Sequence, residues 1–137
     1  MSVVLDVSLT LAWFFDGEAT PEADTVLDEI VATSAVVPQL WRIEVGNALQ
    51  MAIRRQRIDR TFRDATLREL AALPIEIETE SNAHCWSAAL SLADTYDLTL
   101  YDATYVELAQ RRRLPIATLD RALRDAATRL NVPVEGS

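Results

Sequence analysis

Short apolar strand patterns alternate with amphipathic helical patterns along the whole chain. The strand patterns cover residues 3–6, 34–37, 75–78, 115–117 and 132–134. The helical patterns cover residues 8–15, 20–33, 40–55, 60–73, 81–96, 102–113 and 121–130. Strands separated by helices require crossover connections, which favour a parallel sheet with helices on both faces. The sequence therefore predicts one α/β domain over residues 1–137, a three-layer α/β/α fold with a mainly parallel sheet of about five strands.

Missing residue types exclude several kinds of chemistry. All 13 basic residues are arginine, and a chain without lysine can be neither a P-loop nucleotide hydrolase nor a Schiff-base enzyme. Cys85 is the only cysteine, so no internal disulfide can form. Because His84 is the only histidine, the usual Cys/His zinc sites are excluded as well. Any metal must be held mainly by oxygen.

The charge and the hydropathy pattern limit the partners. A net charge of −8 is unlike that of a general nucleic-acid binder, which is usually basic. It still allows an enzyme that handles nucleic acid through a bound cation, and it suits a basic partner segment. No apolar stretch is long enough to span a bilayer, and no signal-peptide pattern precedes the first strand. We therefore expect a cytoplasmic protein without a membrane association.

Four acidic residues occupy positions that a parallel sheet would bring to one edge. Asp6 and Asp120 each end a strand pattern, whereas Glu44 and Asp102 lie near the starts of helical patterns. The carboxyl ends of parallel strands meet at the edge where open α/β sheets bind ligands. Four ionised carboxylates would repel one another there unless a cation intervened. The arrangement predicts a hard, oxygen-bound cation, Mg²⁺ or Mn²⁺, as one or two ions.

Each acid also has a simpler structural explanation. Asp6, Asp102 and Asp120 could each be the N-cap of the helix that follows. Glu44 could form a salt bridge with Arg42. These explanations treat each residue alone and do not account for the shared edge.

Four short segments carry these acids. They are Asp6-Val7-Ser8, Glu44-Val45-Gly46-Asn47-Ala48-Leu49, Tyr101-Asp102-Ala103-Thr104-Tyr105 and Thr118-Leu119-Asp120. In order, spacing and chain length they resemble the PIN domain family and, more narrowly, the VapC-type toxins of bacterial toxin–antitoxin pairs. No single segment is specific, but the four together, in this order and in a chain this short, are strong evidence, and the resemblance covers essentially the whole chain.

The resemblance implies a Mg²⁺- or Mn²⁺-dependent endoribonuclease that hydrolyses RNA phosphodiesters with a metal-activated water. Asp6, Glu44, Asp102 and Asp120 match the family's metal ligands and catalytic acids. The implied partners are a cognate VapB-type antitoxin, an RNA substrate and a second copy in a homodimer.

Five polar residues near the acids could support the site. For Ser8, Thr118 and Asn47, a structural role is an equally good explanation. Ser8 and Thr118 match hydroxyl positions that support the acids in the resembled family. Asn47 lies one helical turn after the second acid and could position substrate or water. Arg121 and Arg124 directly follow the last acid and are candidates for substrate binding.

Three features outside these segments have their own interpretations. The arginines between residues 54 and 63 are either a solvated face, paired with Asp59 and Asp64, or a phosphate-binding rim. The aromatic run 13–15 cannot be buried on one face of a helix, so part of it should reach a protein interface. Trp86 is expected in the core.

Two other functions are compatible with part of this interpretation. The same site could act on DNA or on a small phosphoester. Alternatively, the chain could be a non-catalytic module that acts only with its partner in transcriptional repression.

Overall fold

A five-stranded parallel sheet forms the centre of the protein in a computed structural model that describes residues 2–136. The strands are β1 (Val3–Leu5), β2 (Ala35–Pro38), β3 (Ile75–Glu78), β4 (Ile116–Ala117) and β5 (Val134–Glu135). The helices are α1 (Val7–Ala12), α2 (Pro21–Ala32), α3 (Leu40–Arg54), α4 (Arg60–Ala71), α5 (Ser81–His84), α6 (Ala88–Tyr96), α7 (Leu100–Arg112) and α8 (Arg121–Arg129). The predicted α/β class is confirmed; the two outermost residues of the predicted domain, 1 and 137, lie outside the described residues.

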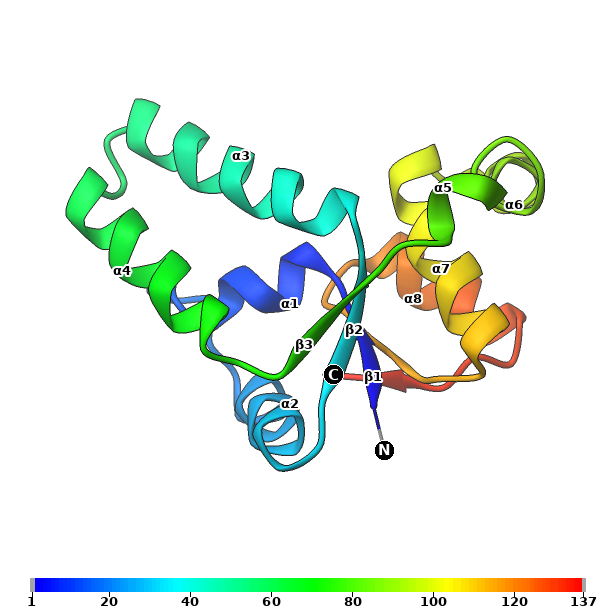
Figure 1. Ribbon diagram of the computed structural model, residues 1–137, viewed down its shortest axis with the longest axis horizontal. Coiled ribbons are helices and arrows are strands. Elements are labelled where there is room, and N and C mark those ends of the chain that lie inside the picture. The colour runs from blue at the N-terminus through cyan, green and yellow to red at the C-terminus, as the bar shows by residue number, and fades with distance from the viewer. Residues whose placement is uncertain (1, 137) are drawn as a thin grey trace.

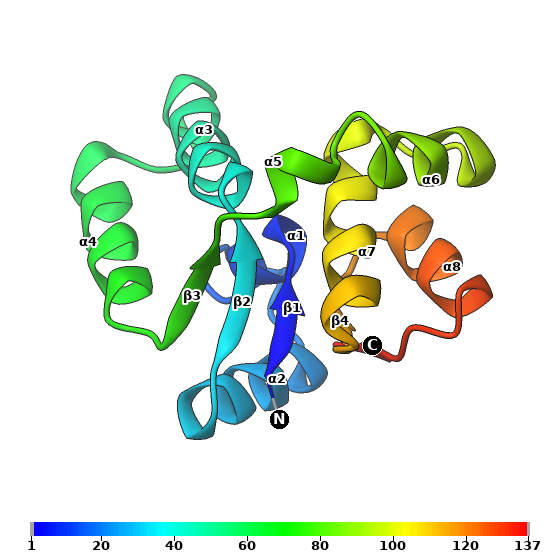
Figure 2. The same ribbon diagram turned by 45° about the vertical axis from the view of Figure 1, so that its right-hand side comes forward.

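Helices cover the sheet from both sides, as predicted. Helix α7 packs on β1, β2 and β4, and α6 and α8 pack against α7 (Figures 1 and 2). On the other side α1 packs against α3, and α3 packs against α4. Every residue of β1 is buried, which is typical of a central strand in a parallel sheet.

The strand order places a topological switch point beside β1. The order is β3-β2-β1-β4-β5, so β2 and β3 lie on one side of β1 while β4 and β5 lie on the other. All four neighbouring pairs are parallel. Ligands of open α/β sheets bind outside the carboxyl ends of the strands at such a point. Here those ends lead into Asp6, which follows β1, and Thr118, which follows β4.

The predicted helix at 81–96 is two helices, and the prediction that Trp86 is buried is wrong. The carboxylate of Glu78 accepts the backbone N–H groups of Glu80 and Ser81, so Ser81 is the first residue of α5 and not its cap. The chain leaves the helical conformation at Ser87, where φ is −122° and ψ is −97°. Trp86 lies in this break and is 86% exposed.

The first predicted helix is also shorter than its apolar pattern indicates. Helix α1 ends at Ala12, and the aromatic run continues as a turn. Phe15 is buried in the core, whereas Trp13 and Phe14 are partly buried against it. The indole N–H of Trp13 donates to the carbonyl of Ala23 at 2.8 Å. Two of the three rings thus remain partly accessible, and their place in a protein interface stays a prediction.

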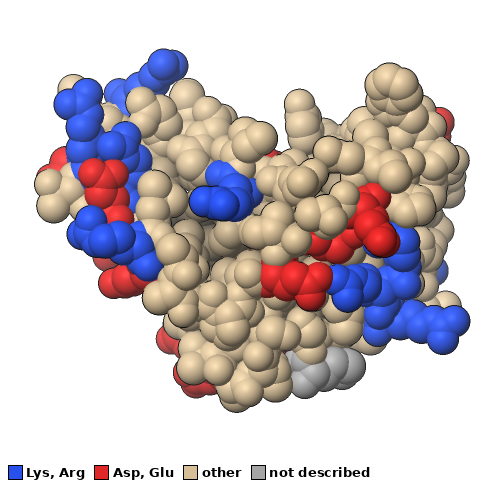
Figure 3. Space-filling model, in the orientation of Figure 1, with Lys and Arg blue, Asp and Glu red and all other residues tan. Residues whose placement is uncertain are grey.

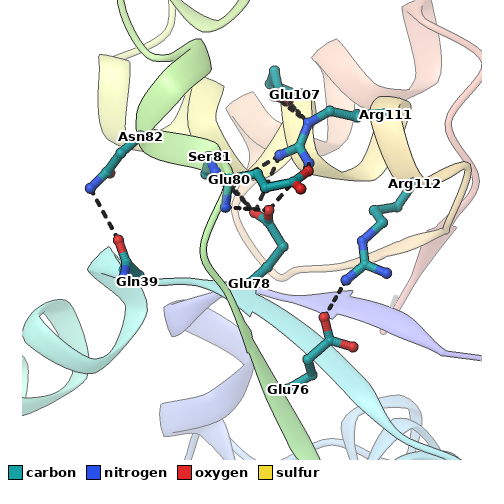
Figure 4. A network of polar contacts seen from close by, with 9 residues as sticks. All are labelled: Gln39, Glu76, Glu78, Glu80, Ser81, Asn82, Glu107, Arg111 and Arg112. Carbon is teal, nitrogen blue, oxygen red and sulfur yellow. Dashed lines mark hydrogen bonds and ion pairs between the residues drawn. The ribbon is translucent and has the colours of Figure 1, made fainter.

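The acidic residues of β3 do not both face solvent, contrary to the strict alternation of its sequence. Glu76 is exposed and forms an ion pair with Arg112, but Glu78 is only 4% exposed. Figure 4 shows Arg111 reaching from α7 to the Glu78 carboxylate at 3.2 Å, while its Nε donates to Glu107 at 2.8 Å. The arginine allows burial of an acid that the sequence pattern places outside.

None of the helices in residues 2–136 is long and apolar enough to cross a membrane.

Candidate functional site

Asp6 lies at the carboxyl end of β1 and is almost completely buried. It is the N-cap of α1, because its Oδ1 accepts the N–H of Leu9 at 3.1 Å. The hydroxyl of Ser8 donates to the same carboxylate at 2.8 Å, and that of Thr118 donates to Oδ2 at 2.5 Å. The capping explanation is therefore correct for Asp6, yet capping uses only one of its bonds. The hydroxyls of Ser8 and Thr118 donate the other hydrogen bonds to this carboxylate.

The same two hydroxyls join the ends of β1 and β4. Thr118 is fully buried, and its Oγ1 accepts the N–H of Asp120 at 2.9 Å. The Oγ of Ser8 accepts the N–H of Leu119 at 3.0 Å. Asp120 is the N-cap of α8, since its Oδ1 accepts the N–H of Leu123 at 3.1 Å. Thr118 thus links Asp6 to Asp120, and Ser8 links Asp6 to Leu119.

Glu44 and Asp102 reach the same edge from α3 and α7. Glu44 is half-buried and accepts the phenolic hydroxyl of Tyr105 at 2.7 Å; no ion pair with Arg42 occurs in the described part of the chain. Asp102 is not an N-cap, because Thr99 caps α7 by accepting the N–H of Asp102 at 3.1 Å. The carboxylate of Asp102 therefore does not cap this helix.

Burial governs the titration of Asp6. It raises the pKa of this carboxyl from 3.8 to about 6, although hydrogen bonds from Thr118, Leu9 and Ser8 act in the opposite direction. The negative charge of Asp120 raises the pKa further. A buried carboxylate with an elevated pKa beside a second acid is typical of a functional site.

Glu44 and Asp102 show the same influences. Burial raises the pKa of Glu44, Tyr105 lowers it by donating a hydrogen bond, and the charges of Asp102 and Asp6 raise it further. Burial also raises the pKa of Asp102, and the charge of Asp120 adds to this effect. Each of the four acids therefore lies within electrostatic range of two others.

The chemistry of this donor set fits a hard divalent cation. Within residues 2–136, none of the four carboxylates forms an ion pair with arginine, and their hydrogen-bond donors are neutral hydroxyl or backbone N–H groups. Oxygen ligands with uncompensated charge are those that Mg²⁺ and Mn²⁺ prefer. However, no three Asp, Glu, His or Cys side chains in that range already converge as a metal-ligand group.

A model of the family described as "PIN domain" matches residues 3–128. The chain belongs to the PIN domain family. Over 133 residues this PIN domain is 29% identical to Ribonuclease VapC3 of Pyrobaculum aerophilum, a match that covers 97% of this chain and 100% of that protein.

Solved structures share the fold of this PIN domain. VapBC2 of Rickettsia felis, bound to a DNA fragment from its promoter, has a TM-score of 0.69 at 11% identity and 98% coverage of both chains. A toxin–antitoxin complex from Klebsiella pneumoniae has a TM-score of 0.60 at 20% identity and 86% coverage of both chains.

The remaining candidate residues of this PIN domain differ in exposure and in hydrogen bonding. Asn47 follows Glu44 by one turn of α3 and is exposed, as is Arg121 in the first turn of α8. Arg124 is half-buried, and its backbone N–H donates to the carbonyl of Asp120 at 3.0 Å. Its Nε is buried without a hydrogen-bond partner among residues 2–136. Of these three side chains, that of Arg124 has a buried donor without an acceptor in the described residues.

Arginines gather at the tip formed by the end of α3 and the start of α4, where Figure 3 shows them mixed with acidic side chains. Arg57 pairs with Glu18 at 3.7 Å and Arg63 with Asp64 at 2.9 Å. Asp59 instead caps α4 by accepting the N–H of Phe62 at 2.8 Å. These contacts fit the solvated, paired face better than a rim of free cations.

Tyr105 is the residue that sequence reasoning missed. It belongs to the third segment, but the resemblance assigns it no role. Its position three residues after Asp102 places both side chains on one face of α7, and a buried phenol needs a hydrogen-bond partner. Those two signals together point to an acid elsewhere in the fold.

Proposed function

We propose that this PIN domain is a Mg²⁺- or Mn²⁺-dependent endoribonuclease of the VapC type, the toxin of a toxin–antitoxin pair. The observation that carries the proposal is that four carboxylates, without arginine partners among residues 2–136, lie near the switch point of the sheet, each within electrostatic range of two others. The full-length similarity to Ribonuclease VapC3 supports ribonuclease activity. The complexes from Klebsiella and Rickettsia support an antitoxin partner of the VapB type.

The four acids have distinct tasks in this proposal. Asp6, Glu44, Asp102 and Asp120 would hold one or two ions, and one of these carboxylates would accept the proton of the attacking water. A bound divalent cation would stabilise charge on the scissile phosphate and lower the pKa of the water. Ser8 and Thr118 would fix the orientation of Asp6 through the hydrogen bonds described above.

Substrate binding is assigned to the start of α8. The guanidinium groups of the half-buried Arg124 and of the exposed Arg121, one turn earlier, would contact neighbouring phosphates. Asn47 would contact substrate or water from α3. Phosphate contacts of this kind position RNA without selecting its sequence.

A basic antitoxin segment suits the net charge of −8. Homodimer formation and a cytoplasmic location complete the proposal.

Incubation of the purified protein with structured RNAs in Mn²⁺ or Mg²⁺, followed by EDTA, tests the activity. Cleavage should require the metal and should be lost in Asp102→Asn, in which Thr99 still caps the helix. Asp6→Asn should also be inactive. The matched control is Asp125→Asn on the exposed face of α8, which should cut as the wild type does. Equal cleavage by all four proteins would refute the proposed site.

Two further substrates distinguish the competing functions. Cleavage of DNA or of bis(p-nitrophenyl) phosphate, with RNA left intact, would keep the site but replace the substrate. Absence of any metal-dependent hydrolysis, combined with partner-dependent binding of promoter DNA, would favour a non-catalytic repression module.

A further inference from the structure

Tyr105 carries a buried hydroxyl directed at Glu44. Its side chain belongs to α7 and is 1% exposed. The hydroxyl donates to Oε1 of Glu44 on α3 at 2.7 Å, across 61 positions of sequence. Among the hydrogen bonds of residues 2–136, this one alone joins α3 to α7. The contact therefore fixes an acid of one helix from the other.

The chemical nature of the donor matters as much as its position. An arginine in this place would neutralise Glu44 and compete with a cation for it. A phenol orients the carboxylate through one hydrogen bond and leaves its negative charge in place. Glu44 thus keeps its charge within range of Asp6 and Asp102, although these like charges oppose it.

The helix geometry links this donor to the other acids. Asp102 is in the first turn of α7, and Tyr105 follows it by one turn on the same face. One helix face therefore supplies an acid and also the group that holds a second acid. Glu44 has no arginine partner in the described residues, so the phenol is the contact that defines its direction.

We propose that Tyr105 is a positioning residue that holds Glu44 toward Asp6 and Asp102, so that Glu44 can serve as a ligand of the divalent cation. Groups that hydrogen-bond to metal ligands fix the ligand orientation, and their loss commonly weakens metal affinity by about 10- to 100-fold. The inference rests on the proposed function, since it assumes that the acids bind a cation.

The variant Tyr105→Phe removes the hydroxyl and leaves the ring in the core. Free Mn²⁺ is measured by electron paramagnetic resonance during titration of the full chain at pH 7.5. The dissociation constant should rise about tenfold or more, and RNA cleavage should recover at higher Mn²⁺ concentration. Tyr101→Phe is the matched control, because Tyr101 lies one turn earlier on α7 and is 64% exposed. It should bind Mn²⁺ as the wild type does.

A second variant covers the case in which Tyr105→Phe does not fold. Glu44→Asp keeps the charge and the tyrosine but shortens the acid by one methylene, which breaks the 2.7 Å contact. It should weaken Mn²⁺ binding in the same way. Wild-type Mn²⁺ affinity in either folded variant would overturn the inference.

The experiment separates this inference from the proposed function. A wild-type protein that binds Mn²⁺ but cuts no RNA refutes the ribonuclease, while the comparison of Mn²⁺ affinities still decides the role of Tyr105. A wild-type protein that binds no Mn²⁺ overturns both.

Discussion

The hydroxyl of Thr118 donates to the carboxylate of Asp6 at 2.5 Å, although the two residues are 112 positions apart in the sequence. Its oxygen also accepts the backbone N–H of Asp120 at 2.9 Å. One buried side chain therefore positions one acid through its carboxylate and a second through its backbone. Strands β1 and β4 are joined at the point where the site lies.

Thr118→Val removes this hydroxyl at nearly constant volume. We expect a loss of about 2 kcal/mol in the free energy of unfolding, because hydrogen bonds to charged groups contribute roughly 1.5–3 kcal/mol. Urea denaturation monitored by circular dichroism measures it. Thr128→Val, on the exposed face of α8, is the control and should change stability by no more than about 0.5 kcal/mol. Equal stability of the two variants would contradict the importance of this bond.

The stability of the metal-free protein should depend on the protonation of Asp6. Its pKa is about 6 in the folded protein and 3.8 ordinarily, so between these pH values the folded state binds more protons than the unfolded state. The free energy of unfolding should therefore rise as the pH falls from about 6 toward 4. A shift of two pKa units corresponds to roughly 3 kcal/mol. Denaturation in EDTA at several pH values tests this, with Asp6→Asn expected to show a weaker dependence.

Mn²⁺ should stabilise the protein, and more at pH 7.5 than at pH 5. A ligand of the folded state contributes about 2.7 kcal/mol at 100 times its dissociation constant, but protonated acids do not bind the metal. The thermal midpoint should rise on addition of Mn²⁺ at pH 7.5 and should not respond in Asp102→Asn. An equal rise at both pH values would argue against carboxylate ligands.

Arg111→Met should be strongly destabilising. Burial raises the pKa of Glu78, but the hydrogen bonds from Arg111, Ser81 and the Glu80 N–H outweigh it and hold the pKa below its usual value. Removing the arginine leaves this buried carboxylate uncompensated, which costs about 3–5 kcal/mol. Urea denaturation of Arg111→Met gives the loss directly.

The neighbouring pair supplies the control for that measurement. Arg112 pairs with the exposed Glu76, and both side chains are open to solvent. Arg112→Met should therefore cost no more than about 1 kcal/mol. Similar losses in the two arginine variants would show that burial of Glu78 contributes little.

Trp86 should be the tryptophan that solvent reaches most easily. Its side chain is 86% exposed, whereas Trp41 is buried and donates to Thr10. Acrylamide should quench the fluorescence of the wild type much more than that of Trp86→Phe, while stability should change by no more than about 0.5 kcal/mol. Identical quenching would place Trp86 in the core after all.

The sequence was sufficient to predict the strands and the positions of the two acids that follow them. Asp6 and Asp120 come directly after apolar runs, and parallel topology brings the ends of such runs together. Asp102 was also placed at the start of a helix, but the residue that caps this helix is Thr99, three positions earlier. The spacing Thr-x-x-Asp contains this signal, since it resembles a capping box.

Other features depend on contacts that no local pattern contains. The bond between Tyr105 and Glu44 exists because two helices approach each other in the folded protein. Glu78 accepts backbone N–H groups just before α5, and it can be buried because Arg111, 33 positions later, reaches its carboxylate. The break that exposes Trp86 follows α5, at Ser87. Local periodicity therefore predicted one helix and an outward-facing acid in place of these features.

The span between Asp6 and Thr118 has a consequence for biosynthesis. A ribosome makes Asp6 at the beginning and the segment that supports it 112 positions later. Until that segment has left the exit tunnel, neither Asp120 nor the hydroxyl of Thr118 can reach Asp6. A ribonuclease built in this order would remain inert while its own messenger RNA is being read, and a prematurely terminated chain would be harmless.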